Sequence, residues 1–241
     1  MHNAAILSED FFRYGSSGGK VDAGAVIGLL TSLRKLDGLR LIQVDHCNVC
    51  SVAQLTDEEL LNIHSLLTKG VRHEKLWVNV GVETPNGELM YASGCGAKMD
   101  GTAPEDWGKF CAEQLHRLCK AGFMPMISLQ LGLPDEKPEH IEETIQWVRT
   151  VANENVTIFP VIYAPVDGEA PPGPESLSRR HWDLISQCYD LNFRRVPGMY
   201  WDNQTGAGVA LWKRLMVQVM GKGQVVMWKT LIARARSKAK S

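Results

Sequence analysis

The sequence predicts an α/β protein built on parallel strands, in the form of a partial TIM-like (β/α) barrel followed by a C-terminal helical extension. A short β-rich apolar run followed by an amphipathic helical stretch occurs five times before residue 168. Alternation of this kind favours parallel pairing with right-handed crossovers. Every run also ends in polar, glycine or proline residues, and ligands bind at the carboxyl ends of parallel strands. A doubly wound sheet binds its ligand at one switch point, whereas here all five strand ends carry such residues, so a barrel is favoured. Five units cannot close an eight-stranded barrel, so the predicted barrel is partial.

The first two units carry clear helix signals. The run AAIL, residues 4 to 7, precedes a helix that begins after the N-cap Asp22, ends at Gly38 and carries Val26, Leu29, Leu30, Leu33 and Leu36 on one face. The run LRLIQV, residues 39 to 44, precedes a helix that opens with a capping box at Thr56 and buries Leu60, Ile63 and Leu67.

The next three units repeat the pattern. LWVNVGV, residues 76 to 82, is followed by a glycine-rich loop and a helix that starts near Pro104, with Trp107, Cys111, Leu115 and Leu118 on one stripe. The fourth run, residues 123 to 133, leads into a helix with Ile141, Ile145 and Val148 at helical spacing. The fifth run is VTIFPVIYA, residues 156 to 164.

The character of the chain changes after the fifth unit. We predict a barrel over residues 1–168, a Pro-rich linker over 169–176 and a helical extension over 177–241. The extension opens with a helix that carries Trp182, Ile185, Cys188 and Leu191. An irregular stretch around Pro197, Trp201 and Asp202 should follow, and then two apolar and basic helices separated at Gly221 and Gly223.

The charge distribution limits the classes of partner. A net charge of −1 excludes a nucleic-acid or membrane footprint over the whole surface, and we expect no nucleic-acid partner. From Thr205 to Ser241, however, there is no acidic residue, while eight are basic. This tail could meet an anionic membrane face, but a solvated basic face is the favoured interpretation. No secretory signal opens the chain, so we expect a cytoplasmic protein with reduced cysteines.

Glu83 is the strongest single candidate for binding. It ends the third run, where its carboxylate can accept hydrogen bonds from ribose hydroxyls or an ammonium group, and Gly81 should let a ligand approach closely. The alternative is that Glu83 caps the following turn.

Polar residues at the other strand ends are weaker candidates. Asp45 and His46 follow the second run and Tyr163 closes the fifth, and each could serve in acid/base catalysis. Glu9 and Asp10 follow the first run. If both carboxylates face the site, their repulsion raises one pKa, whereas capping or solvation is the equal alternative.

Two further motifs carry less weight. Gly132 and Pro134 form a turn that should leave the main chain of Leu131, Gly132, Leu133 and Pro134 open to a flat ligand such as adenine. Cys47 and Cys50 have the spacing of half a zinc site, but no second pair follows, so we predict no metal site.

Several stretches together resemble one family. ILSEDFFRYG, VGVETPNGEL and LGLPDEKPEHIEETIQWV, in this order over residues 4 to 168, are similar to the radical S-adenosylmethionine (SAM) enzymes, closest to the branch associated with cobalamin. The resemblance implies a partial (β/α)6 barrel whose second to sixth strands are the visible runs. It also implies SAM, a 4Fe-4S cluster and cobalamin as cofactors, with Glu9 and Asp10 by the methionine amino group, Glu83 near the ribose, and Leu131 to Pro134 beside the adenine.

The chain departs from this family at the cluster. The C-x-x-x-C-x-x-C loop of the family is absent from the sequence, and Asp135 and Lys137 replace a glycine and a threonine of its G-L-P-G-E-T motif. Without a cluster, SAM cleavage has no electron donor.

The first hypothesis is therefore a fragment of a radical SAM enzyme that performs cluster-dependent radical chemistry, such as cobalamin-dependent methylation, on a small or unidentified substrate. It is expected to be inactive without the missing cluster-binding segment, and its expected partner is that N-terminal segment or a cobalamin-binding domain. The second is a descendant of that fold that binds SAM or a partner without turnover. The third is a barrel-type enzyme using Glu83, Asp45 and His46 as acid/base groups or metal ligands.

Overall fold

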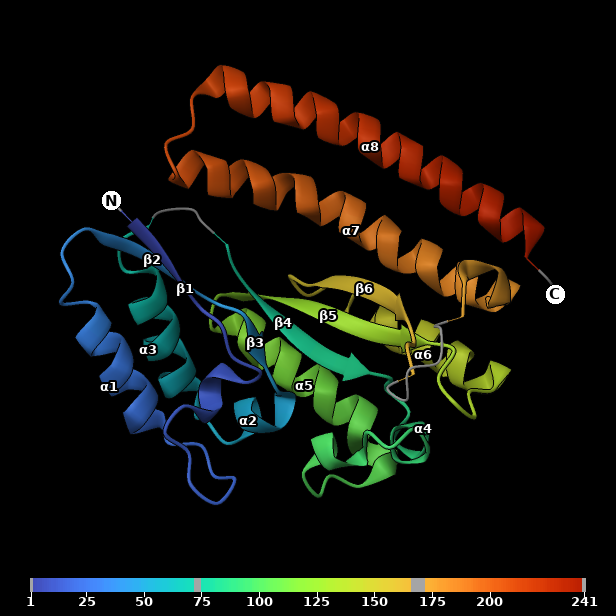
Figure 1. Cartoon of the computed structure of the whole chain (residues 1–241), viewed down its shortest axis with the longest axis horizontal. Helices are drawn as coiled ribbons and strands as arrows, with labels where there is room; N and C mark the ends of the chain where they lie inside the picture. Colours follow the sequence, from blue (N-terminus) through green and yellow to red (C-terminus); the bar gives the residue numbers. More distant parts are fainter. Residues whose placement is uncertain (1, 72–74, 166–171, 240–241) are drawn as a thin grey trace.

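The computed structural model describes residues 2–71, 75–165 and 172–239, with only the backbone of His2 (Figure 1). Within these ranges the protein is a mixed α/β fold with parallel sheets. Its strands are β1 His2–Ile6, β2 Leu39–Val44, β3 His46–Cys47, β4 Leu76–Glu83, β5 Phe123–Leu131 and β6 Thr157–Ile162. Its α-helices are α1 Ala23–Leu33, α2 Val49–Ala53, α3 Asp57–Thr68, α4 Gly87–Ala92, α5 Trp107–Lys120, α6 Pro138–Val151, α7 Arg179–Gly206 and α8 Leu211–Lys238. Short 3-10 turns are η1 Phe11–Arg13, η2 Gly96–Met99, η3 Pro104–Asp106 and η4 Pro174–Ser176.

The strands follow one another in chain order and are all parallel. β1 pairs with β2, and β3, β4, β5 and β6 form a second ladder in that order. The chain passes from one ladder to the other at Asp45, whose carbonyl accepts the N–H of Asn79 at 2.8 Å. The amide nitrogen of Gln43 donates to the carbonyl oxygens of Val44, at 2.6 Å, and of Trp77. Where the pairing of β2 with β1 ends and the chain approaches β4, these bonds of Asp45 and Gln43 take the place of regular ladder hydrogen bonds.

The two faces of β5 have different neighbours. Ile127, Leu129 and Leu131 are fully buried and belong to the hydrophobic core that also includes residues of α5 and α6. The alternate residues Met126, Ser128 and Gln130 are only partly buried and point to the opposite side, since successive side chains of a strand alternate. We call this side the inner face. Helix α5 lies on the far side of the sheet from α8, whereas α7 runs along the free edge of β6 and also contacts α6 (Figure 1).

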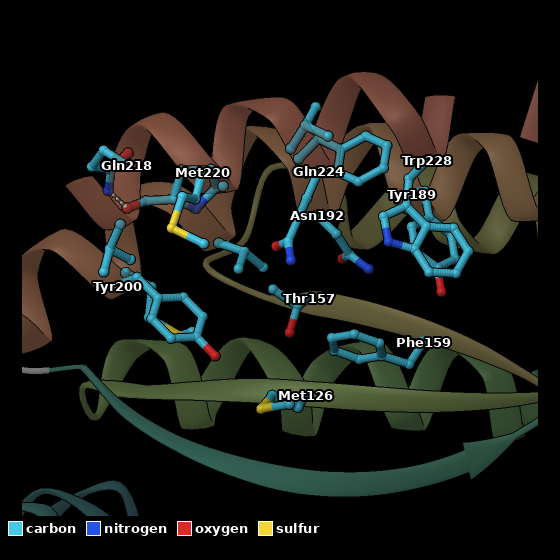
Figure 2. A pocket seen from close by; sticks show the side chains of 17 residues that line it. Met126, Thr157, Phe159, Tyr189, Asn192, Tyr200, Gln218, Met220, Gln224 and Trp228 are labelled. Atoms are coloured by element: carbon cyan, nitrogen blue, oxygen red, sulfur yellow. Dashed lines mark hydrogen bonds between the residues drawn. The ribbon is translucent and has the colours of Figure 1, made fainter. Parts of the chain in front are cut away.

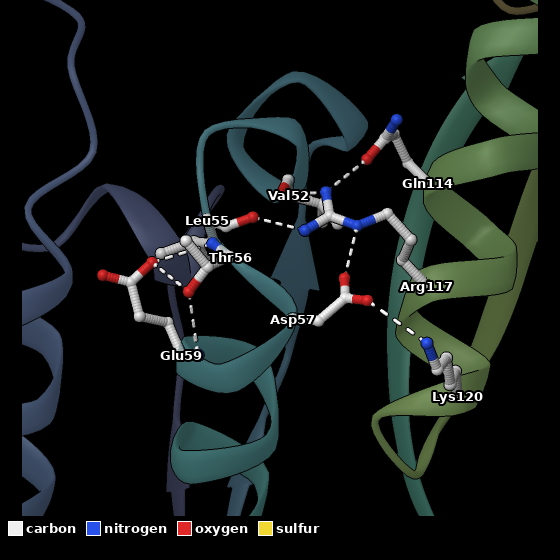
Figure 3. A network of polar contacts seen from close by, with 8 residues as sticks. All are labelled: Val52, Leu55, Thr56, Asp57, Glu59, Gln114, Arg117 and Lys120. Carbon is white, nitrogen blue, oxygen red and sulfur yellow. Dashed lines mark hydrogen bonds and ion pairs between the residues drawn. The ribbon is translucent and has the colours of Figure 1, made fainter.

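The helix α3 begins where the sequence predicts it. Thr56 accepts the N–H of Glu59 at 3.2 Å, and the Glu59 carboxylate accepts the N–H of Thr56 at 2.8 Å, so the capping box is confirmed. Arg117 of α5 holds the same turn by donating to Asp57 at 2.8 Å and to the carbonyl oxygens of Val52, at 3.2 Å, and Leu55 (Figure 3). Hydrogen bonds from Arg117 and Lys120 lower the pKa of Asp57.

The predicted N-cap and core stripes are confirmed in most units. Asp22 accepts the N–H of Ala25 at 2.9 Å, and the stripes predicted for α3, α5 and α6 are buried. Leu36 is an exception, because α1 ends at Leu33 and leaves Leu36 exposed beyond it.

The C-terminal extension is more regular than the sequence predicts. The irregular stretch expected at Pro197 is wrong, since α7 continues through it to Gly206. A proline inside a helix costs about 3 kcal/mol. Packing against α8 offsets this cost: Gln218 donates to the Pro197 carbonyl at 2.7 Å, and Arg214 lies 4.7 Å from the ring of Trp201.

The predicted break at Gly221 and Gly223 is also wrong. Both glycines lie inside α8, which is continuous over 28 residues. A glycine costs a helix only about 1 kcal/mol. Contacts on either side of the glycines hold α8 to α7: Gln218 bonds Pro197 as described, and Trp228 stacks on Tyr189 with ring centroids 6.0 Å apart.

Helix α7 protects the free edge of the sheet. The Asn192 side chain accepts the N–H of Ile158 at 2.8 Å and donates to its carbonyl oxygen at 2.6 Å. These two bonds replace the missing ladder partner of β6, and an edge strand needs such cover.

Two predictions concern segments that the structure describes only in part. The Pro-rich linker 169–176 falls partly outside the described residues, and its described end contains η4. Within the described ranges, no helix has both the length and the apolar character needed to cross a membrane.

Candidate functional site

Polar side chains gather on the inner face near the carboxyl ends of the strands. Register pairs Asn79 of β4 with Met126 of β5, and Met126 with Thr157 of β6. Two residues further along, Gly81 pairs with Ser128, and beyond them Glu83 meets Gln130. We call the group Asp45, His46, Asn79, Glu83, Lys98 and Gln130 the inner-face site.

Glu83 lies at the centre of this site. Its side chain is buried, and its carboxylate pairs with the ammonium group of Lys98 from η2 and accepts a hydrogen bond of 2.8 Å from the amide nitrogen of Gln130. A buried carboxylate is stable only when it is paired in this way. The predicted binding residue thus has two donors already aimed at it, and the capping alternative does not describe its contacts.

Gly81 creates the space that this pair occupies. A Cβ atom at Gly81 would lie 2.5 Å from Oε1 of Glu83 and 3.2 Å from Nζ of Lys98. The sequence predicts that Gly81 makes room for a ligand, but in the structure Glu83 and Lys98 fill that room. Glu83 itself has φ of 62°, a conformation uncommon for residues other than glycine, and this turn aims its side chain back over the strand.

Asp45 and His46 form a second polar group beside Asn79. Nδ1 of His46 lies 3.0 Å from Oδ2 of Asp45, and the amide nitrogen of Asn79 donates to Oδ1 at 2.9 Å. Both the His46 and the Asp45 side chains keep contact with solvent. A histidine oriented by a carboxylate can move a proton, so the pair can act in acid/base chemistry.

Glu9 and Asp10 do not form a joint carboxylate site. Glu9 is exposed, whereas Asp10 caps η1 by accepting the N–H of Phe12 at 3.2 Å and the hydroxyl of Ser51 at 2.6 Å. The pKa of Asp10 is raised, but by burial and not by repulsion from Glu9. Asp10 therefore has a structural role, and only the Glu9 carboxylate remains open to solvent.

The segment from Leu131 to Pro134 does not expose its main chain as predicted. The carbonyl of Leu131 accepts the N–H of Tyr163 at 2.9 Å, the N–H of Gly132 donates to Glu136 at 2.9 Å, and the carbonyl of Leu133 accepts the N–H of Glu136 at 3.1 Å. Leu133 is buried. The prediction of open main-chain groups is therefore wrong for the carbonyls of Leu131 and Leu133 and for the N–H of Gly132. These groups already form hydrogen bonds with Tyr163 and Glu136.

Glu136 belongs to a buried pair that sequence reasoning missed. Its Oε2 lies 2.6 Å from Nε2 of His181, and Nδ1 of His181 lies 2.8 Å from the hydroxyl of Ser178, the N-cap of α7. The pair ties the Gly132 turn to the start of α7. The capping-box spacing from Ser178 to His181 is visible in the sequence, but its link to Glu136 is not.

Cys47 and Cys50 do not have the properties of ligands for a 4Fe-4S cluster. Cys47 and Cys50 are buried thiols; burial raises the pKa of Cys50 to about 11 and holds that of Cys47 well above its usual value. The Cys50 thiol donates to the carbonyl of Lys98 at 3.1 Å. Metal ligation needs thiolates, and no three His, Cys, Asp or Glu side chains of the described residues are grouped to hold a metal ion. Cys47 and Cys50 are therefore not suited to ligate a 4Fe-4S cluster.

A cavity of about 560 Å³ adjoins the site on the inner face (Figure 2). Met126 and Phe159 of the sheet, Tyr189 and Tyr200 of α7 and Trp228 of α8 line it. The buried hydroxyl of Thr157, which also lines the cavity, has no hydrogen-bond partner among the described residues. The size is that of a small-molecule pocket, and the lining is mostly apolar.

Asn79, Lys98 and Gln130 are the residues of the site that the sequence did not reveal. Gln130 is a polar residue inside an apolar strand, which was a usable signal. Lys98 comes from the glycine-rich loop before α5 and carries no signal of its own.

Comparison with known proteins gives no match for this chain, either to a family model or to a curated sequence.

Proposed function

We propose that this chain forms the SAM-binding part of a partial (β/α) barrel of the radical SAM type, and that these residues bind SAM without cleaving it. The observation that carries the proposal is the buried carboxylate of Glu83, held at the carboxyl end of β4 on the inner face by Lys98 and Gln130.

The strand order supports a partial barrel. In a doubly wound sheet the order reverses at a switch point, whereas here β1 to β6 follow the chain with no reversal. One-directional winding of parallel strands is the arrangement of (β/α) barrels, whose ligands bind at the carboxyl ends of the strands.

The polar groups fit parts of SAM. The Glu83 carboxylate can accept hydrogen bonds from the ribose hydroxyls, and Lys98, whose side chain is 46% exposed, can turn toward solvent or toward the ligand carboxylate. Glu9 is the carboxylate open to the amino group of the ligand. The adenine cannot use the N–H of Gly132 or the carbonyl of Leu131, which are already bonded, so it would stack on the exposed ring of Pro134.

SAM supplies an activated sulfonium, which releases a radical or a methyl group only when an electron or a nucleophile reaches it. The described residues do not supply an iron–sulfur donor. Turnover would require a partner or segment that carries a C-x-x-x-C-x-x-C motif, and a cobalamin-binding domain belongs to the same proposal.

The cavity suggests where a second substrate would lie. Met126 lines the cavity, and Gln130, four residues further along β5, donates to Glu83. At about 3.3 Å per residue, Met126 and Gln130 are about 13 Å apart. A molecule with an apolar part in the cavity would therefore reach the polar end of the inner face.

Isothermal titration of the purified chain with SAM tests the proposal. We expect micromolar binding without added iron, and a loss of tenfold or more in affinity for Glu83→Gln. The matched control is Glu113→Gln, which removes an exposed carboxylate from α5 and should leave binding unchanged. Failure to bind at millimolar SAM, or equal affinity of the Glu83 variant, contradicts it.

A second candidate is an acid/base enzyme that uses His46, and the Asp45–His46–Asn79 hydrogen bonds favour it. This candidate predicts that His46→Ala abolishes an activity that needs no SAM, while His116→Ala, an exposed histidine on α5, preserves it. A hydrolytic or isomerase activity unaffected by His46→Ala would exclude it.

A further inference from the structure

Helix α8 presents an apolar stripe to solvent. Trp212, Met216, Val219 and Val226 recur at intervals of four and three residues, with Gly223 between them, which places them on one side of the helix. Trp212 is 62% exposed, Val219 72% and Val226 66%. Leu215 and Met227 border the stripe and are also exposed. We call these residues the α8 stripe.

The side of α8 that meets α7 mixes apolar and polar contacts: Ile232 is buried, and Trp228 stacks on Tyr189. Arg214 donates to the hydroxyl of Thr205, Gln218 bonds the Pro197 carbonyl, and Lys229 pairs with Asp190 at 3.6 Å. Arg236 pairs with Asp183 at 2.5 Å. A soluble helix normally turns its polar side to solvent, so a second apolar side that no described residue covers marks the α8 stripe as a contact surface.

Basic residues border the stripe, and acidic residues are absent. At 3.6 residues per turn, Lys213 and Lys222 fall on its opposite edges. Neither they nor Arg234 and Lys238 form an ion pair among the described residues. No Asp or Glu occurs between Thr205 and Ser241, although the whole chain has a net charge of −1. The positive charge is thus concentrated at this helix.

We propose that α8 docks on an anionic lipid surface, with the α8 stripe at the boundary of headgroups and acyl chains and the lysines directed to the lipid phosphates. Apolar residues with an exposed tryptophan, bordered by long basic side chains, are typical of helices that lie in the membrane interface. Against a second copy of this chain, two such helices would bring like charges together with no acid to offset them. The occupant is therefore a negatively charged bilayer.

Sedimentation with vesicles tests the proposal on the intact chain. Vesicles of 70:30 phosphatidylcholine and phosphatidylglycerol should bind the protein, and vesicles of phosphatidylcholine alone should bind it at least tenfold more weakly. Raising the salt from 0.1 M to 0.5 M should weaken the anionic binding, because it screens the lysine–phosphate attraction.

Two variants with matched controls separate the apolar and basic contributions. Val219→Gln combined with Val226→Gln should lower vesicle affinity tenfold or more, whereas Leu61→Gln, which changes an exposed leucine on α3, should not. Lys213→Gln combined with Lys222→Gln should lower it by roughly fivefold per lysine. Lys109→Gln on α5 should have no effect. Near-UV circular dichroism checks that each variant is folded.

Three results would overturn the proposal. The first is no binding of the folded chain to anionic vesicles. The second is binding that the valine pair leaves unchanged. The third is self-association in sedimentation velocity that the valine pair abolishes while vesicle binding is absent, which would make the stripe an interface between copies.

Discussion

Glu83 and Lys98 form an ion pair in which a buried carboxylate meets a half-exposed ammonium group. Gly81 provides the room for it, and Gln130 satisfies the second carboxylate oxygen. The pair holds a carboxylate in place at the carboxyl end of β4. The first two predictions concern this pair.

Lys98→Met should destabilise the protein by about 1–2 kcal/mol, because Glu83 would lose its counter-charge while remaining buried. The half-exposed position of Lys98 keeps the cost below that of a fully buried pair. Urea unfolding measures the change. Lys109→Met, at an exposed position of α5, should change the free energy of unfolding by less than about 0.5 kcal/mol. If the double variant Glu83→Gln/Lys98→Met is less stable than Lys98→Met, the unpaired charge is not the cause.

Gly81→Ala should disrupt the same pair by steric contact. Its methyl group would need the place now taken by Oε1 of Glu83, so we expect a loss of about 1–3 kcal/mol and weaker SAM binding. Gly28→Ala is the matched control: its Cβ would meet nothing within 4 Å, and α1 should gain up to about 1 kcal/mol. Equal effects of the two substitutions in thermal unfolding would disprove the steric argument.

His64 should make stability depend on pH. Burial lowers its pKa, so the folded state binds this proton more weakly than the unfolded chain. This contribution to stability is complete above the unfolded pKa, near 6.5, and is lost as pH falls through that value toward the lowered folded pKa. Urea unfolding between pH 8 and 5 should show the loss. His64→Phe, which retains a ring against Phe123, should remove this component, and His116→Gln should retain it.

Asn192→Leu should cost about 2 kcal/mol or more, because the N–H and carbonyl of Ile158 would be left without their partners. Amide hydrogen exchange in β6 should accelerate in this variant. Asn62→Leu, at an exposed position of α3, serves as the control and should leave both stability and exchange unchanged. Protection of the Ile158 amide that survives Asn192→Leu would show that the edge is held by other contacts.

Local signals in the sequence predicted much of the fold. The caps at Asp22 and Thr56 and the core stripe from Trp107 to Leu118 depend on neighbours a few residues away, and the structure confirms them. Pro197 and the glycines of α8 were misleading because tertiary contacts between α7 and α8 outweigh local helix propensity.

The site was less accessible to sequence reasoning. Glu83 was found because it ends a strand, but Gln130 lies 47 positions further on and meets it only through the register of β4 and β5. The main chain from Leu131 to Pro134 appeared open because its partners, Tyr163 and Glu136, are fixed by the fold and not by adjacent sequence.

Backbone amide NMR during a SAM titration tests whether SAM binds at the inner-face site. We predict that the amides of Gly81, Glu83, Lys98 and Gln130 shift together and saturate, while that of Leu61 on α3 does not move. The absence of shifts at millimolar SAM, or shifts that saturate only at residues away from the carboxyl ends of β4 and β5, would contradict the claim.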